Sequence, residues 1–151
     1  MKRVGLIGGC FGMILLLTGC GNEVELTCTM EESASYVTST QQYHFVYADE
    51  ELVTMDQGVM IEVDDSYSYM NSYLSNLTED FEEELDDYVS ELGQDVVDGD
   101  VNVDGNHFTA SMSYNVNHMS ADQLDYIAYE EEFANYEGAK AYLEDQGYTC
   151  K

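Results

Sequence analysis

The chain has 151 residues, of which 31 are Asp or Glu and only 4 are Lys or Arg, so its formal net charge at pH 7 is −27. This length suits one domain after a leader, and a surface of this charge repels phosphate backbones, which excludes nucleic acid as an expected partner. Such a charge keeps a protein soluble, or it serves to bind cations or basic partners. The 13 Tyr residues and the periodic apolar positions predict a folded domain rather than a disordered chain.

Residues 1–19 have the pattern of a secretory signal peptide. Lys2 and Arg3 form a positive start, an apolar run extends from Val4 to Leu17, and the small residues Thr18 and Gly19 follow. The apolar run has about 14 residues, fewer than the roughly 20 that span a bilayer, which favours a cleaved leader over a permanent transmembrane helix. Cleavage at another site, as in an ordinary signal peptide, is a further alternative.

The string Leu17-Thr18-Gly19-Cys20 resembles the lipobox of bacterial lipoproteins. The resemblance implies that Cys20 is diacylated on sulfur, with palmitate-type chains, and becomes the N-terminus. Two acyl chains are enough for stable anchoring. We therefore expect a protein tethered through residues 20–23 to the extracytoplasmic face of a bacterial cell membrane. Its mature part keeps two cations, Lys140 and Lys151, against all 31 acids, a formal charge of −29.

Cys28 and Cys150 remain near the two ends of the mature domain. Outside the cytoplasm, two such cysteines usually pair, and we predict a disulfide between them. Closing a loop of about 120 residues stabilises a fold by at most roughly 4–5 kcal/mol in the chain-entropy picture. Two free thiols are the alternative. A metal site built from these cysteines and the scattered histidines is less favoured than either.

Three strands are predicted in the first part of the domain. Apolar residues alternate from Val24 to Met30, and the polar stretch Glu31–Ser35 is expected to end that strand. Residues 36–47 place Tyr43, Phe45 and Tyr47 on one face, and residues 52–63 place Val59, Ile61 and Val63 on one face. The acidic residues 49–51 form the turn between them, so the pattern indicates an antiparallel hairpin or meander.

A long helix follows, from Asp64-Asp65-Ser66 to about Leu92. The short polar side chains at its start are helix caps, and Gly93 is a natural stop. Its apolar positions recur at spacings of three and four. They are Met70, Tyr73, Leu74, Leu77, Phe81, Leu85, Tyr88, Val89 and Leu92.

Two strands and two helices complete the chain. Residues 95–103 and 108–116 alternate around the turn dipeptide Asp104-Gly105, and Ser120-Ala121-Asp122-Gln123 resembles a capping box for a short helix to about Ala128. A final helix over residues 136–146 should place Ala139, Tyr142 and Leu143 against the sheet. Residues 148–150 then return toward the first strand. This order predicts an α+β domain over residues 24–151, with an antiparallel sheet of about five strands and the long and C-terminal helices on one face.

The chain is similar to the YehR-like family of small bacterial lipoproteins, a domain whose function is not established. The resemblance rests on the lipobox, the early Cys28, the hairpin followed by a long acidic and aromatic helix, and the ending Gly147-Tyr148-Thr149-Cys150-Lys151. It implies an α+β domain anchored outside the membrane. It supplies no catalytic residues to carry over.

Asp100, Asn102 and Asp104, followed by Gly105, match the first half of a calcium-binding loop. The twelfth position is Ser111, where such a loop needs a bidentate Glu, and no helices flank the segment. The alternating valines of the same segment also fit a β-hairpin, which is the interpretation we favour. The three residues remain a weak metal-site candidate.

Seven acids of the long helix form like-charge pairs four residues apart, which predicts a solvated outer face or a docking strip for divalent cations or a basic envelope partner. They are Glu79, Asp80, Glu82, Glu83, Glu84, Asp86 and Asp87. His44, His107 and His118 have no ligand spacing, so we expect structural or surface roles. Most tyrosines lie at periodic positions and are expected in the core or at its edge, although some could line a carbohydrate or peptide groove.

No nucleophile motif, phosphate loop or zinc motif occurs in the sequence. We therefore expect a monomeric, non-enzymatic binding or structural module of the cell envelope, with no cofactor. The alternative is a lipoprotein that binds a cation or another solute for uptake. An extracytoplasmic hydrolase is a second, less favoured alternative.

Overall fold

The first three strands form the predicted meander in a computed structural model that describes residues 23–127 and 129–151. They are β1 (Glu23–Ala34), β2 (Val37–Ala48) and β3 (Glu51–Val63), paired antiparallel. The expected break at Glu31–Ser35 is wrong, because Val37–Thr40 of β2 pair with β1 through Ala34. Backbone hydrogen bonds sustain a strand even where its side chains are polar.

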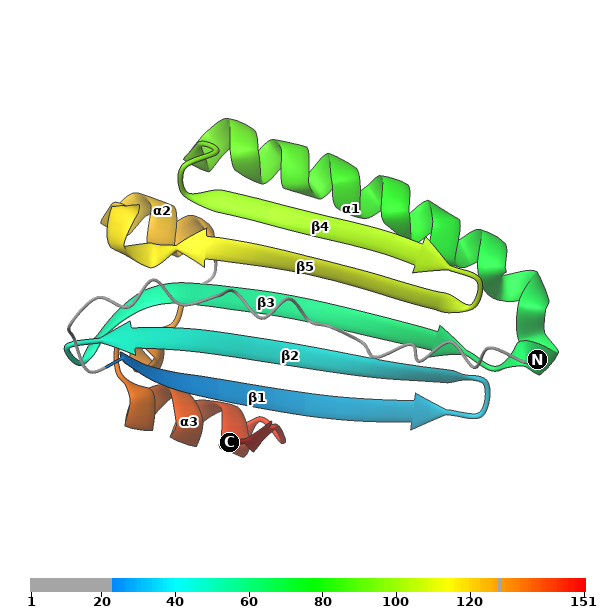
Figure 1. Cartoon of the computed structure of the whole chain (residues 1–151), viewed down its shortest axis with the longest axis horizontal. Coiled ribbons are helices and arrows are strands. Elements are labelled where there is room, and N and C mark those ends of the chain that lie inside the picture. The colour runs from blue at the N-terminus through cyan, green and yellow to red at the C-terminus, as the bar shows by residue number, and fades with distance from the viewer. Residues whose placement is uncertain (1–22, 128) are drawn as a thin grey trace, which may run out of the picture.

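The second hairpin joins the sheet beside β3 rather than at the free edge of β1. β4 (Val97–Asp104) pairs with β5 (His107–Asn115), and β5 pairs with β3. β6 (Thr149–Cys150) adds two residues on the far side of β1, opposite Cys28 and Thr29. The sheet therefore has six strands in the order β4-β5-β3-β2-β1-β6, where about five were predicted (Figure 1).

The long helix begins later than expected. Asp64 caps its start by accepting a 2.8 Å hydrogen bond from the backbone N–H of Ser66, but Asp65–Met70 is the 3₁₀ segment η1. The α-helix α1 is Asn71–Leu92, and it ends at Gly93, whose φ of 94° favours glycine. The predicted apolar stripe is correct except at Tyr73, which is 54% exposed while its neighbour Leu74 is fully buried.

The C-terminal part folds largely as predicted. Ser120 and Gln123 form the capping box of α2 (Ala121–Tyr126), which follows the short 3₁₀ turn η2 (Val116–His118). The 3₁₀ segment η3 (Glu131–Ala134) inserts Phe133 into the core, and α3 (Tyr136–Asp145) buries Ala139 and Leu143. These segments bring the chain back to β1, where β6 completes the sheet.

Both main helices cover the same face of the sheet. Directly opposed residues of neighbouring strands point to one side, and the register aligns Cys28, Tyr43, Gln57, Met112 and Gly99 across β1, β2, β3, β5 and β4. At one end of this row α3 lies over β1, and at the other α1 lies along β4 (Figure 1). The α+β class with helices on one face is therefore confirmed.

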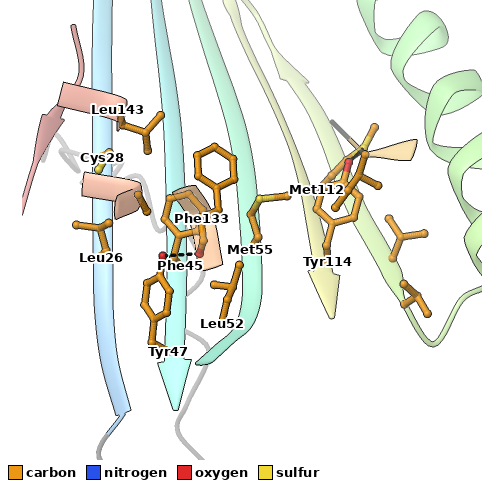
Figure 2. Close-up of a cluster of buried hydrophobic side chains, with 14 of the residues drawn as sticks. Leu26, Cys28, Phe45, Tyr47, Leu52, Met55, Met112, Tyr114, Phe133 and Leu143 are labelled. Atoms are coloured by element: carbon orange, nitrogen blue, oxygen red, sulfur yellow. Dashed lines mark hydrogen bonds between the residues drawn. The ribbon is translucent and has the colours of Figure 1, made fainter. Parts of the chain in front are cut away.

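The main core lies beneath the C-terminal segments. Phe133 of η3 packs on Phe45 with ring centroids 5.1 Å apart, and its carbonyl oxygen accepts a 3.1 Å hydrogen bond from the Tyr47 hydroxyl (Figure 2). Leu26, Met55 and Leu143 surround this contact and are at most 2% exposed. Burying one such side chain contributes roughly 1.5–3 kcal/mol.

The predicted disulfide joins Cys28 to Cys150 across a sequence separation of 122 residues. The backbone around it is paired as well, because Thr27 and Lys151 exchange N–H to carbonyl hydrogen bonds of 3.1 and 2.9 Å. The bond therefore ties the end of the domain to the strand that follows the proposed lipid site.

Candidate functional site

A groove remains where neither helix covers the middle of the sheet. It has a volume of about 330 Å³ and is open to solvent. Its floor comes from β2, β3 and β5, and one wall comes from α1. Ligand pockets in proteins typically measure about 300–1,000 Å³, so this groove has the size of a small-molecule site.

Two amide side chains form the polar part of the floor. Gln57 lies between Tyr43 of β2 and Met112 of β5 in the cross-strand register, and Gln41 lies opposite Val59. The Gln41 side-chain oxygen accepts a 2.8 Å hydrogen bond from the Tyr148 hydroxyl. The Gln57 amide nitrogen has only a weak hydrogen bond within the described residues, to the Met55 sulfur at 4.0 Å. Polar groups therefore interrupt a face that is apolar at both ends.

Aromatic rings flank these amides on both sides. Tyr88 of α1 meets Tyr114 of β5 edge to face, with centroids 6.1 Å apart. Tyr43 meets Tyr148 in the same manner at 5.6 Å. Phe81 adds a second ring to the wall formed by α1. Aromatic faces beside a few polar groups are the usual lining of a binding site for an organic ligand.

One carboxylate, that of Glu84, lines the groove. Glu84 is an exposed residue of α1. Burial raises the pKa of the Tyr88 hydroxyl, and the carboxylate of Glu84 raises it further. The pKa of Tyr114 is also raised, first by burial and then by Tyr88 and Glu84. A pKa raised by a carboxylate shows that a second negative charge is disfavoured there.

The tyrosines divide between core, groove and surface. Tyr47 and Tyr114 are each 2% exposed, which confirms the expected core role for these two. Tyr36, Tyr69, Tyr73 and Tyr126 are instead exposed by between 41% and 73%. The sequence periodicity did not distinguish these groups.

The weak metal candidates lie along an edge strand. Asp100, Asn102 and Asp104 alternate along β4, are exposed, and lie opposite Ser111, Thr109 and His107. The favoured hairpin is confirmed, with Gly105 and Asn106 in its turn. In an extended strand, Asp100 and Asp104 are about 13 Å apart. Among residues 23–127 and 129–151, no three His, Cys, Asp or Glu side chains are grouped to hold a metal ion.

A polar network occupies the opposite, open face of the sheet. His44 Nδ1 is 3.0 Å from the Asp56 carboxylate, and His44 Nε2 is 3.5 Å from that of Glu25. The Ser113 hydroxyl donates a 2.5 Å hydrogen bond to the second Asp56 oxygen. The hydrogen bond to Asp56 raises the pKa of His44, against the opposing effect of burial.

This network does not have the order of a hydrolase triad. In such a triad a histidine stands between serine and carboxylate and takes the serine proton. Here Asp56 stands between Ser113 and His44. The network is therefore suited to holding β2, β3 and β5 in register rather than to activating a nucleophile.

The seven acids of α1 that were singled out in the sequence are all exposed. Six of them form a solvated surface, and Glu84 also lines the groove. Of the other two histidines, His118 contacts the Asn115 amide at 3.2 Å and His107 is exposed. Cys20 and the leader lie outside the described residues. No helix in the described part of the chain is long and apolar enough to cross a membrane.

Comparison with known proteins finds a similar fold and gives no information on the site. No family model and no curated protein matches the chain. Its structure is similar to the NMR structure of a protein from Streptococcus pneumoniae TIGR4, with a TM-score of 0.53 and 14% sequence identity. The match covers 100% of this chain and 98% of that one. At this identity the similarity shows a common fold and nothing about ligands.

Proposed function

We propose that this protein is an exported, lipid-anchored, non-enzymatic binding module, held on the extracytoplasmic face of a bacterial cell membrane and related to the YehR-like lipoproteins. The groove formed by α1 with β2, β3 and β5 is its ligand site. The lipobox at Leu17–Cys20 supports the anchor. The Cys28–Cys150 disulfide supports the compartment, because such bonds persist in oxidising environments.

The observation that carries the binding role is the composition of the groove floor. A sheet face covered by helices is normally filled with apolar side chains. Here Gln57 occupies the centre of that face, between Tyr43 and Met112, where Met or Leu would pack. Gln41 and Gln57 are half-buried amides between aromatic walls. The Gln41 oxygen is used within the fold by Tyr148, so Gln57 is the amide that offers hydrogen bonds to a ligand.

The absence of tryptophan from the chain allows a direct test. Phe81→Trp places a single tryptophan in the wall of the groove, and Tyr69→Trp places one at an exposed position outside it. Both variants are purified as lipoproteins from membranes in a non-ionic detergent. A dialysable fraction of the cell envelope is expected to change the emission of Phe81→Trp saturably and to leave Tyr69→Trp unchanged. Equal responses, or none, would refute the proposed site.

A further inference from the structure

The polarity of the groove limits the charge of its ligand. Among the described residues the only ion pairs are those of His44, so Glu84 has no cationic partner there. Lys140 and Lys151 are the only Lys or Arg residues after the leader. An anionic ligand would be repelled by the Glu84 carboxylate, which adds to the effect of burial in raising the pKa of Tyr88 and Tyr114. A cation would meet attraction instead.

The helix places the charge and two rings on one surface. Phe81, Glu84 and Tyr88 are spaced by three and four residues, so their side chains lie along one side of α1. All three line the groove, where Tyr114 and Tyr43 face them from the sheet. A carboxylate flanked by aromatic rings is the arrangement that recognises an ammonium group, through an ion pair and cation–π contacts together.

We propose that the groove binds a small organic ammonium ion, with its charged nitrogen beside Glu84 and the Tyr88 ring and its carbon chain against Phe81. This inference rests on the proposed function and names the ligand class of the same site. The amide oxygen of Gln57 is the acceptor for an N–H group of the ligand. A bare divalent cation suits the groove poorly, because it takes six or more oxygen ligands and Glu84 is the only carboxylate in the lining.

The test compares three probes of similar length and different charge: putrescine, butanediol and succinate. Each is titrated into the Phe81→Trp lipoprotein in a polyoxyethylene detergent, at ionic strength held constant with sodium chloride. Putrescine is expected to change the emission saturably, and to bind at least about tenfold more tightly than butanediol, since an ion pair and a cation–π contact are both missing from the latter. Succinate is expected to leave the emission unchanged.

Two matched charge variants distinguish binding at the groove from general attraction of putrescine to the acidic surface. Glu84→Gln, made in the Phe81→Trp background, is expected to weaken putrescine binding by about three- to tenfold. Glu83→Gln removes the same charge from the adjacent, exposed position that does not line the groove, and is expected to leave the affinity within about twofold. Tyr88→Phe should retain binding and Tyr88→Leu should weaken it, because only the former keeps the ring.

The possible outcomes are distinct. Equal losses in Glu84→Gln and Glu83→Gln would overturn the inference, since the attraction would then belong to the whole acidic surface. Tighter binding of butanediol than of putrescine would also overturn it, while leaving the groove as a ligand site. If the emission of Phe81→Trp changes with none of the three probes and not with the envelope fraction, the proposed function itself would be refuted.

Discussion

Leu85 of α1 lies directly over Gly99 of β4. A Cβ atom on residue 99 would be 2.8 and 2.9 Å from the two Leu85 δ carbons and 3.0 Å from the Ser111 carbonyl oxygen. Glycine at this position lets the helix approach the edge of the sheet closely. The same approach places Phe81, Glu84 and Tyr88 above β5, so the wall of the groove depends on it.

Gly99→Ala is expected to lower the free energy of unfolding by about 1–2 kcal/mol, because the added methyl group overpacks the contact with Leu85. Restricting the unfolded chain offsets part of that cost. Urea denaturation measures the change. In the double variant with Leu85→Ala, the loss should be smaller than the sum of the two single losses, since the smaller side chain relieves the contact. Strict additivity would contradict a direct contact.

Removal of the disulfide should destabilise the domain. Cys28→Ala with Cys150→Ala is expected to lower the free energy of unfolding by about 2–5 kcal/mol, because the unfolded chain is no longer closed into a long loop. Thermal unfolding with and without a thiol reductant gives the measurement. The reductant should lower the Tm of the wild-type protein and leave that of the double variant unchanged. Equal stability of both proteins under oxidising conditions would show that the bond does not form.

The His44 network predicts a defined pH dependence. The pKa of His44 in the folded state is raised above the unfolded value of about 6.5. The stabilisation that charged His44 gives the folded protein is therefore fully present below about pH 6.5 and is lost as pH rises through the folded pKa. His44→Gln should therefore cost stability at mildly acidic pH and progressively less at higher pH.

Urea denaturation of wild type and His44→Gln at several pH values measures this difference. His118→Gln serves as the control, because that ring contacts the Asn115 amide and forms no ion pair with a carboxylate of the described residues. The difference in unfolding free energy between His118→Gln and wild type should not decrease with pH in the same way. A His44→Gln difference that is constant with pH would contradict the contact with Asp56.

The acidic surface of α1 should destabilise the helix at low ionic strength. Glu83 lies four residues from both Glu79 and Asp87, and each like-charge pair costs a few tenths of a kcal/mol. Added NaCl or Mg²⁺ is therefore expected to raise the Tm of the protein. Glu83→Lys converts both repulsions into attractions and should add about 1 kcal/mol at low salt. No rise in Tm between low and physiological salt would contradict this account of the surface.

Local patterns were sufficient for most elements of the fold. The alternation of Tyr43, Phe45 and Tyr47 predicted β2, and the Ser120–Gln123 capping box predicted α2. Such signals lie within a few residues of one another, so sequence shows them directly. The 3₁₀ start of the long helix was not predicted, because its polar caps suit either kind of helix.

The groove and the His44 network depend on long-range register, which sequence does not display. His44, Asp56 and Ser113 become neighbours only because β3 pairs with both β2 and β5. Gln57 and Gln41 were the local indications of the groove, since both are polar residues at inward positions of their strands. Two polar residues among apolar ones did not reveal that the helices leave this part of the sheet uncovered.

The most direct test of an exported, lipid-anchored binding module is the intact mass of the protein isolated from cell membranes, followed by peptide mapping without reduction. The account predicts a chain that begins at Cys20 and carries a diacylglyceryl group on its sulfur, together with a peptide pair linked through Cys28 and Cys150. A retained leader, or an unmodified thiol at Cys20, would contradict the anchor and the compartment in which the ligand is proposed to be met.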